Sequence, residues 1–127
     1  MEGDLNQVVL RGNLGVEPDL RYTPQGLPIT RFDLATSQHE RNHETGEEHN
    51  VTQWHHIVLF DDLAEIAGNE LKKGDRVYIE GALKKRKWKS KNGYEHAVTE
   101  VIAHHMKIIT HETFVPRVKP FVEIYQD

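Results

Sequence analysis

Short runs in which apolar and polar residues alternate make up most of this sequence, and this period of two constrains the fold more than any other feature. Side chains of a strand point alternately to its two faces, so each run can bury one face and expose the other. Turn-forming residues separate the runs. The pattern therefore predicts an all-β domain with strands over Leu5–Leu14, Pro28–Ser37, Val51–Phe60, Arg76–Trp88 and Tyr94–Ile109.

One helix is predicted between the third and fourth strands, over Leu63–Lys72. Asp62 and Glu65 have the spacing of a capping box, and Gly74 lies just past the last expected helical residue. The polar stretch Gln38–Asn50 suits a long exposed hairpin loop. Three strands, a helix and two strands are the element order of an OB-fold, a five-stranded Greek-key barrel that often binds oligonucleotides.

The size and composition fit a single domain. The chain has 127 residues and no cysteine, so we expect one core and neither disulfides nor a thiolate zinc site. We predict a domain over residues 1–112 and a C-terminal extension over residues 113–127. The N-terminus lacks the basic flank and apolar run of a signal peptide, and no run of eighteen apolar residues occurs. A cytoplasmic protein is expected.

The positive charge of the chain is concentrated in one segment. Lys72–Lys91 contains nine Lys or Arg against two acidic residues, a local charge of +7, whereas the rest carries seven against eighteen, or −11. Charges farther apart than about one Debye length, ~8 Å at physiological salt, are largely screened. The local charge therefore matters more for phosphate binding than the net charge of −4.

The same segment carries a tryptophan. Alternation along Arg76–Trp88 places Val77, Ile79 and Leu83 inward, and Lys84, Arg86 and Trp88 together on the other side. Past Leu83 both faces are cationic, so the hairpin between the fourth and fifth strands should project from the barrel. Its turn, Ser90–Gly93, contains an Asn-Gly pair that favours a tight turn. Solvation alone is the alternative interpretation of such a charged hairpin.

The third strand offers two more rings. Trp54, His56, Val58 and Phe60 share one face, while His55, Ile57 and Leu59 share the other and are interpreted as core. Trp54 and Phe60 lie roughly 20 Å apart at a rise of ~3.3 Å per residue. Proteins that bind single strands without sequence preference combine such rings with a cationic groove. A core or interface role for Trp54 and Phe60 stays an open alternative.

An enzymatic interpretation starts from His39-Glu40-Arg41-Asn42-His43, which matches the H-E-x-x-H pattern of zinc peptidases. That site needs both imidazoles on one turn of a helix. The flanking residues provide no apolar face that would hold a helix in place. We therefore expect no catalytic residues, no metal and no cofactor.

With these residues identified, the chain resembles the bacterial single-stranded DNA-binding protein family over about residues 5–110. The matching blocks include Val8–Gly15, Pro18–Tyr22, Leu34–Ser37, Trp54–Phe60, Leu63–Glu65, Lys73-Gly74, Val77–Gly81, Arg86–Trp88 and Thr99–Val101. The resemblance implies an OB-fold that binds single-stranded DNA as a homotetramer in replication, recombination or repair, with a dimer as the alternative assembly.

The resemblance also implies roles for individual residues. It assigns base stacking to Trp54, Phe60 and Trp88, and phosphate contacts to Lys73, Lys84, Arg86 and Lys87. Lys89, Arg21 and His56 complete the candidate DNA-binding set, and His55 and Tyr78 are expected at subunit contacts.

Two departures from the family pattern affect these expectations. Many members carry a further stacking Trp where this chain has Glu40, which should weaken or shorten the binding path. The acidic C-terminal tip that recruits replication and repair proteins is missing from the end of the sequence, so such partners are not assigned. The rival functions are a primosomal-type or RNA-binding OB adaptor and a protein-interaction OB module.

Overall fold

The computed structural model describes residues 3–110, and the expected C-terminal extension lies outside the described residues. It contains one helix, α1 (Asp61–Glu70), and six strands: β1 (Val8–Leu14), β2 (Asp19–Tyr22), β3 (Pro28–Arg41), β4 (Glu48–Phe60), β5 (Arg76–Lys89) and β6 (Glu95–Ile108). The order across the sheet is β1-β5-β6-β4-β3-β2, and β1 also pairs with β3. That pairing closes β1, β5, β6, β4 and β3 into a five-stranded barrel, which confirms the predicted OB-fold.

Inward-facing aliphatic side chains fill the barrel. Ile57, Leu59, Val77 and Ile79 are fully buried, as alternation predicted. Leu83 was also predicted to point into the core, but 50% of its surface is exposed. It lies where β5 leaves the barrel, and the side chain of Asn6 binds its backbone N–H and C=O there.

Helix α1 covers part of the barrel through Leu63, Ala64 and Ala67. The Thr30 hydroxyl donates to the Ala64 carbonyl at 2.6 Å in the buried contact with β3. The predicted helix ends were wrong. Asp62 is already inside the helix and no side chain caps it, so the capping box does not form. Leu71 ends the helix in an extended conformation, and Gly74, with φ +92°, belongs to the following turn.

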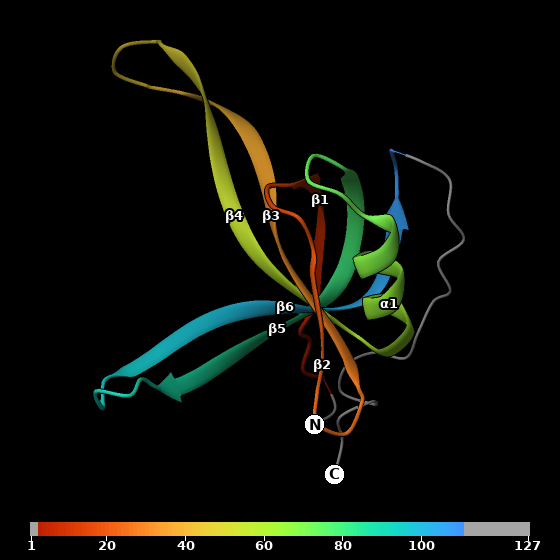
Figure 1. Ribbon diagram of the computed structural model, residues 1–127. Coiled ribbons are helices and arrows are strands. Elements are labelled where there is room, and N and C mark those ends of the chain that lie inside the picture. The colour runs from red at the N-terminus through yellow and green to blue at the C-terminus, as the bar shows by residue number, and fades with distance from the viewer. Residues whose placement is uncertain (1–2, 111–127) are drawn as a thin grey trace.

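Two long hairpins project from the barrel in different directions (Figure 1). The β5–β6 hairpin was predicted. Its turn ends on Gly93, whose φ of +84° suits glycine. The β3–β4 hairpin replaces the predicted loop over Gln38–Asn50, because β3 and β4 stay paired as far as Arg41 and Glu48. Both faces of this hairpin are polar and exposed near its tip, so no apolar alternation marks it as strand.

Two further features of the sheet were not predicted. The turn-prone segment after Pro18 forms the short strand β2, which pairs with β3. The β5–β6 register shifts between Glu80 and Gly81, leaving His104 without a partner position in the ladder. A Cβ on Gly81 would lie 2.2 Å from the Ile102 carbonyl oxygen, so this shift depends on a glycine. Within residues 3–110, no helix has the length and apolar character needed to cross a membrane.

Candidate nucleic-acid interface

The strand registers place the three candidate rings, together with Lys84, Arg86 and His56, on one outer side of the sheet. On β4, His56 is opposite Glu100 and Val58 is opposite Ile102 of the parallel strand β6. Across the antiparallel β5–β6 ladder, partner positions share a side of the sheet. We call this side the aromatic face; it comprises Arg31, Asp33, Trp54, His56, Val58, Phe60, Lys84, Arg86, Trp88, His96, Val98, Glu100 and Ile102.

Both tryptophans of the aromatic face are open to solvent. Trp54 is 57% exposed and Trp88 is 42% exposed, whereas Phe60 is partly buried. A core role for Trp54, which the sequence left open, is therefore wrong for the isolated chain. Exposed indoles on one side of a sheet have the surface that base stacking requires.

The indole ring of Trp54 lies against the backbone of Gly15, the residue that follows β1. A Cβ on Gly15 would fall 2.2 Å from Cζ3 and 2.5 Å from Cη2 of the indole. These atoms are the far end of a side chain that can rotate, so an added methyl group would move the ring rather than the backbone. Trp54 can therefore occupy this position only because residue 15 is a glycine.

We predict that Gly15→Ala weakens oligonucleotide binding while leaving thermal stability close to that of the wild type, because it displaces an exposed ring. Binding to a fluorescently labelled oligo(dT) and the melting temperature would both be measured. In a Trp54→Ala background the same substitution should have no further effect on binding. An equal loss in both backgrounds would contradict this explanation.

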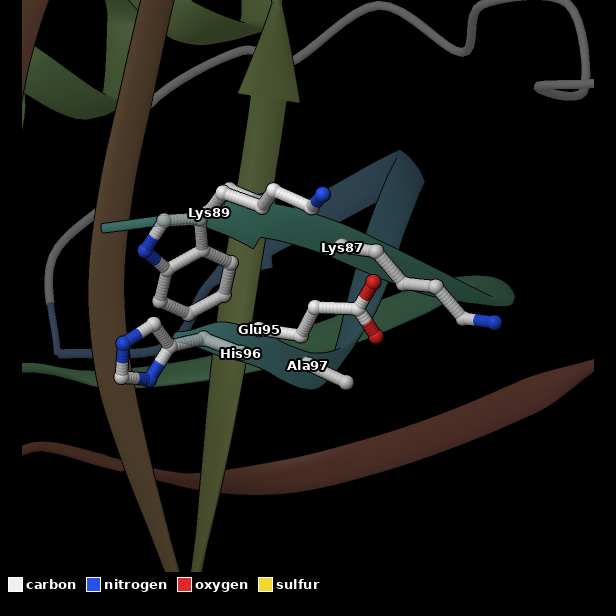
Figure 2. Close-up of a pocket in the computed structure, with 6 residues that line it drawn as sticks. Lys87, Lys89, Glu95, His96 and Ala97 are labelled. Carbon is white, nitrogen blue, oxygen red and sulfur yellow. The ribbon is translucent and has the colours of Figure 1, made fainter. Parts of the chain in front are cut away.

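Trp88 is the centre of a cluster on the β5–β6 hairpin. The Arg86 guanidinium carbon lies 4.7 Å from the indole centroid, and the His96 imidazole stacks on the indole at 5.2 Å and 19°. Figure 2 shows Lys87 and Lys89 on β5 above Glu95, His96 and Ala97 of β6. These side chains line a hollow of about 510 Å³. The sequence analysis did not include His96 among the site residues. A signal was present, because Trp88 and His96 are each four residues from Asn92 in the turn, and they are partners in the ladder.

Glu100 joins two of the cations on the aromatic face. Its carboxylate accepts hydrogen bonds from Arg86 Nε at 3.0 Å and Arg86 Nη2 at 3.4 Å, and Arg31 Nε lies 3.6 Å away. Only 5% of Glu100 is exposed. Arg86 was expected as a simple phosphate contact, but it is already paired in the structure. Neither Arg31 nor Glu100 was among the predicted site residues.

Two other predicted cations, Lys87 and Lys89, alternate to the opposite side of β5 but still line hollows beside the candidate rings. Lys87 lines a hollow of about 400 Å³ with Phe60 and Lys84, and Lys89 lines the hollow beside Trp88. Arg21 lies on β2, where its side chain pairs with Asp19 at 3.0 Å. Arg21 is the partner of Ile29 on β3, and Ile29 is the partner of Phe60 on β4. Arg21 therefore lies two strands from Phe60, on the same side of the sheet.

Two further predicted DNA contacts have acidic neighbours. The His56 Nδ1 atom lies 2.8 Å from Oδ1 of Asp33 on the aromatic face. Lys73 lies in the turn between α1 and β5, and its backbone N–H donates to Glu17 at 3.1 Å. Glu17 lines a hollow with Trp88 and His56, which connects this turn to the aromatic face.

The two residues expected at subunit contacts lie in different parts of the barrel. His55 pairs with Leu34 and its Nε2 is 2.8 Å from the Thr36 hydroxyl. Partial burial lowers the pKa of His55, and the neighbouring His56 lowers it further. Tyr78 faces out from β5, donates to Glu80 at 2.7 Å and makes an edge contact with His105 at 6.2 Å.

The peptidase-like motif has no helix to support it. His39 is in β3, with Nε2 3.1 Å from Glu48, and His43 is in the hairpin loop. The two imidazoles therefore do not share a helical turn. Within residues 3–110, no group of three or more His, Asp or Glu side chains is arranged to hold a metal ion.

Comparison with known proteins agrees with the fold and with the earlier resemblance. The model of the single-strand binding protein family matches residues 5–109. A Plasmodium falciparum SSB solved with single-stranded DNA is 33% identical, with a TM-score of 0.79 over 86% of this chain and 98% of that chain. A deletion mutant of the Thermus aquaticus single-stranded DNA binding protein is 34% identical, with a TM-score of 0.73 over 83% of this chain and 50% of that chain. The chain belongs to the single-strand binding protein family.

Proposed function

We propose that this protein binds single-stranded DNA without regard to base sequence and protects it during replication, recombination or repair. The observation that carries the proposal is the aromatic face, where two exposed indoles lie beside a cationic hairpin. Family membership supports the same ligand, since a similar chain has been solved with single-stranded DNA. The role is binding alone, and the chain catalyses no reaction.

In this proposal, bases stack on Trp54, Phe60 and Trp88. The phosphates pair with cations along the edge of the aromatic face and on the turn and strand beside it: Lys73, Lys84, Arg86, Lys87, Lys89, Arg21 and His56. Stacking is tolerant of sequence because every base has a flat π-face. The cations provide attraction that depends on salt.

The proposed binding unit is one domain over residues 1–112 that assembles as a homotetramer, with His55 and Tyr78 at subunit contacts. The assembly is carried by the family resemblance, and both residues offered for it have partners within the chain, Thr36 for His55 and Glu80 for Tyr78. With DNA as its ligand, the protein would act in the cytoplasm, in association with the nucleoid.

We predict that oligo(dT) quenches the tryptophan fluorescence and that log K falls with log salt by about 0.7 for each phosphate neutralised. Titrations at several salt concentrations and oligonucleotide lengths would measure both effects. Competition with oligo(U) separates DNA binding from an RNA adaptor. A protein-interaction module predicts no dependence on length, and unchanged emission with salt-independent binding would overturn the proposal.

A further inference from the structure

A buried carboxylate lies within the surface that we propose to bind DNA. Glu100 is one of two buried polar or charged residues among residues 3–110, and it lies between Arg31 of β3 and Arg86 of β5. Burial of a carboxylate is costly unless cations and hydrogen bonds compensate it. Both arginine side chains are nearly half exposed, so they connect the buried carboxylate to solvent. We call these three side chains the ionic bridge.

The ionic bridge lies midway between two of the proposed stacking rings. Glu100 is opposite His56 of β4 and Lys84 of β5. Phe60 is four residues past His56, and Trp88 is four residues past Lys84, each ~13 Å away along its strand at ~3.3 Å per residue. Because β5 runs antiparallel to β6 while β4 runs parallel to it, the two rings lie in opposite directions from Glu100.

The bridge also separates two hollows of the aromatic face. One hollow, of about 310 Å³, is lined by Trp88 and His56, and the other, of about 400 Å³, is lined by Phe60 and Lys84. Arg31, Arg86 and Glu100 line both. A strand that runs from Phe60 to Trp88 must therefore cross the ionic bridge.

We propose that the ionic bridge is a phosphate-binding site between the two hollows, and that Glu100 is its positioning residue. This inference rests on the proposed binding of single-stranded DNA. Each guanidinium has five N–H donors, and Glu100 engages only two groups of Arg86 and one of Arg31. The other donors can bind a phosphate. Two arginines against one carboxylate leave a net charge of +1 at the crossing.

Glu100 would act by fixing the orientation of both guanidinium groups before DNA arrives. Long side chains lose rotamer freedom when they bind, and this loss weakens association. A buried partner that already holds them reduces the loss. If Glu100 had no positioning role, its negative charge would only repel DNA, and removal of the charge would strengthen binding. If Glu100 positions the two arginines, removal of the charge weakens binding.

The decisive comparison is Glu100→Gln against Glu95→Gln, measured by binding to labelled oligo(dT). Each variant removes one negative charge from β6, but Glu95 is exposed near the hairpin tip. We expect Glu95→Gln to bind as tightly as the wild type or tighter. Glu100→Gln should bind roughly tenfold more weakly, because the oriented contacts of charged groups are lost. Binding by Glu100→Gln that matches or exceeds Glu95→Gln would overturn the proposal.

A second variant keeps the test valid if Glu100→Gln fails to fold, which its melting curve would show. Arg86→Lys retains the charge but loses the planar fork that binds carboxylate and phosphate together. It should weaken binding roughly tenfold with an unchanged salt slope. Combined with Glu100→Gln, it should add little, because both changes disrupt one unit. Wild-type affinity for Arg86→Lys, or fully additive losses, would contradict the proposal.

The wild-type titration separates the two levels of inference. If the wild type does not bind oligo(dT), the proposed function fails. If the wild type binds and the bridge variants bind equally well, the function stands and the role of Glu100 is wrong.

Discussion

Combined substitution of the two indoles, Trp54→Ala with Trp88→Ala, is expected to weaken oligo(dT) binding by about 2–6 kcal/mol, since each stacked base contributes ~1–3 kcal/mol. Both rings are exposed in the isolated chain, so their loss removes stacking surface without opening the core. Trp88 should account for the larger part, because Arg86 and His96 already hold its ring in place. Anisotropy of a labelled oligonucleotide would measure the affinity, since the intrinsic tryptophan signal is lost.

The matched control is the pair Trp54→Phe with Trp88→Phe, which keeps a flat ring at each position. It should retain most of the affinity, while the melting temperatures of the alanine and phenylalanine pairs stay close to that of the wild type. The salt slope should also change little in the alanine pair, because no cation is removed. Wild-type affinity in the alanine pair would show that binding depends on charge alone.

The fold was predictable where one face of a strand is buried and the other is exposed to solvent. Ile57 and Leu59, like Val77 and Ile79, followed the period of two because the barrel core selects apolar residues at alternate positions. The same rule failed over Gln38–Asn50, where both faces of the hairpin are exposed and only backbone pairing defines the strands. It also failed at Leu83, because alternation shows which side a residue faces but not where the barrel ends.

The sequence did not predict the helix boundaries or the bulge, because both depend on the local conformation of the backbone. Asp62 has the spacing of a cap, but the chain already turns at Asp61, whose φ is +56°, directly after β4. The shift between Glu80 and Gly81 inserts His104 and reverses the alternation along β6. A sequence pattern with a fixed period cannot place such an insertion.

The site could be predicted one strand at a time but not as a surface. Alternation placed Trp54 with Phe60, and Lys84 and Arg86 with Trp88. Which groups meet across strands depends on the registers through β6, so Glu100, Arg31 and His96 were missed. Glu40 is an example of the same limit. It is five residues from Ala35, the partner of Trp54, so alternation places it on the opposite side of β3 from the aromatic face.

The substitution Leu34→Ala is expected to lower the free energy of unfolding by about 2–5 kcal/mol, the range for deleting a fully buried leucine side chain. Leu34 has 0% of its surface exposed and is a partner of Leu14 in the β1–β3 pairing that closes the barrel. The cavity left by Leu34→Ala would therefore lie where β1 and β3 close the barrel. Urea unfolding followed by circular dichroism would measure the change, at one fixed protein concentration because assembly adds to apparent stability.

Leu83→Ala is the matched control, since it deletes the same atoms from a side chain that is half exposed. Alternation alone places Leu83 in the core with Ile79 and predicts a loss similar to that of Leu34→Ala. The structure places it outside the core and predicts a change within about 0.5 kcal/mol, as for other surface positions. Equal losses in dilute protein would contradict the structural placement of Leu83. A loss that appears only at higher concentration would instead assign Leu83 to a contact between copies, because only an association step depends on concentration.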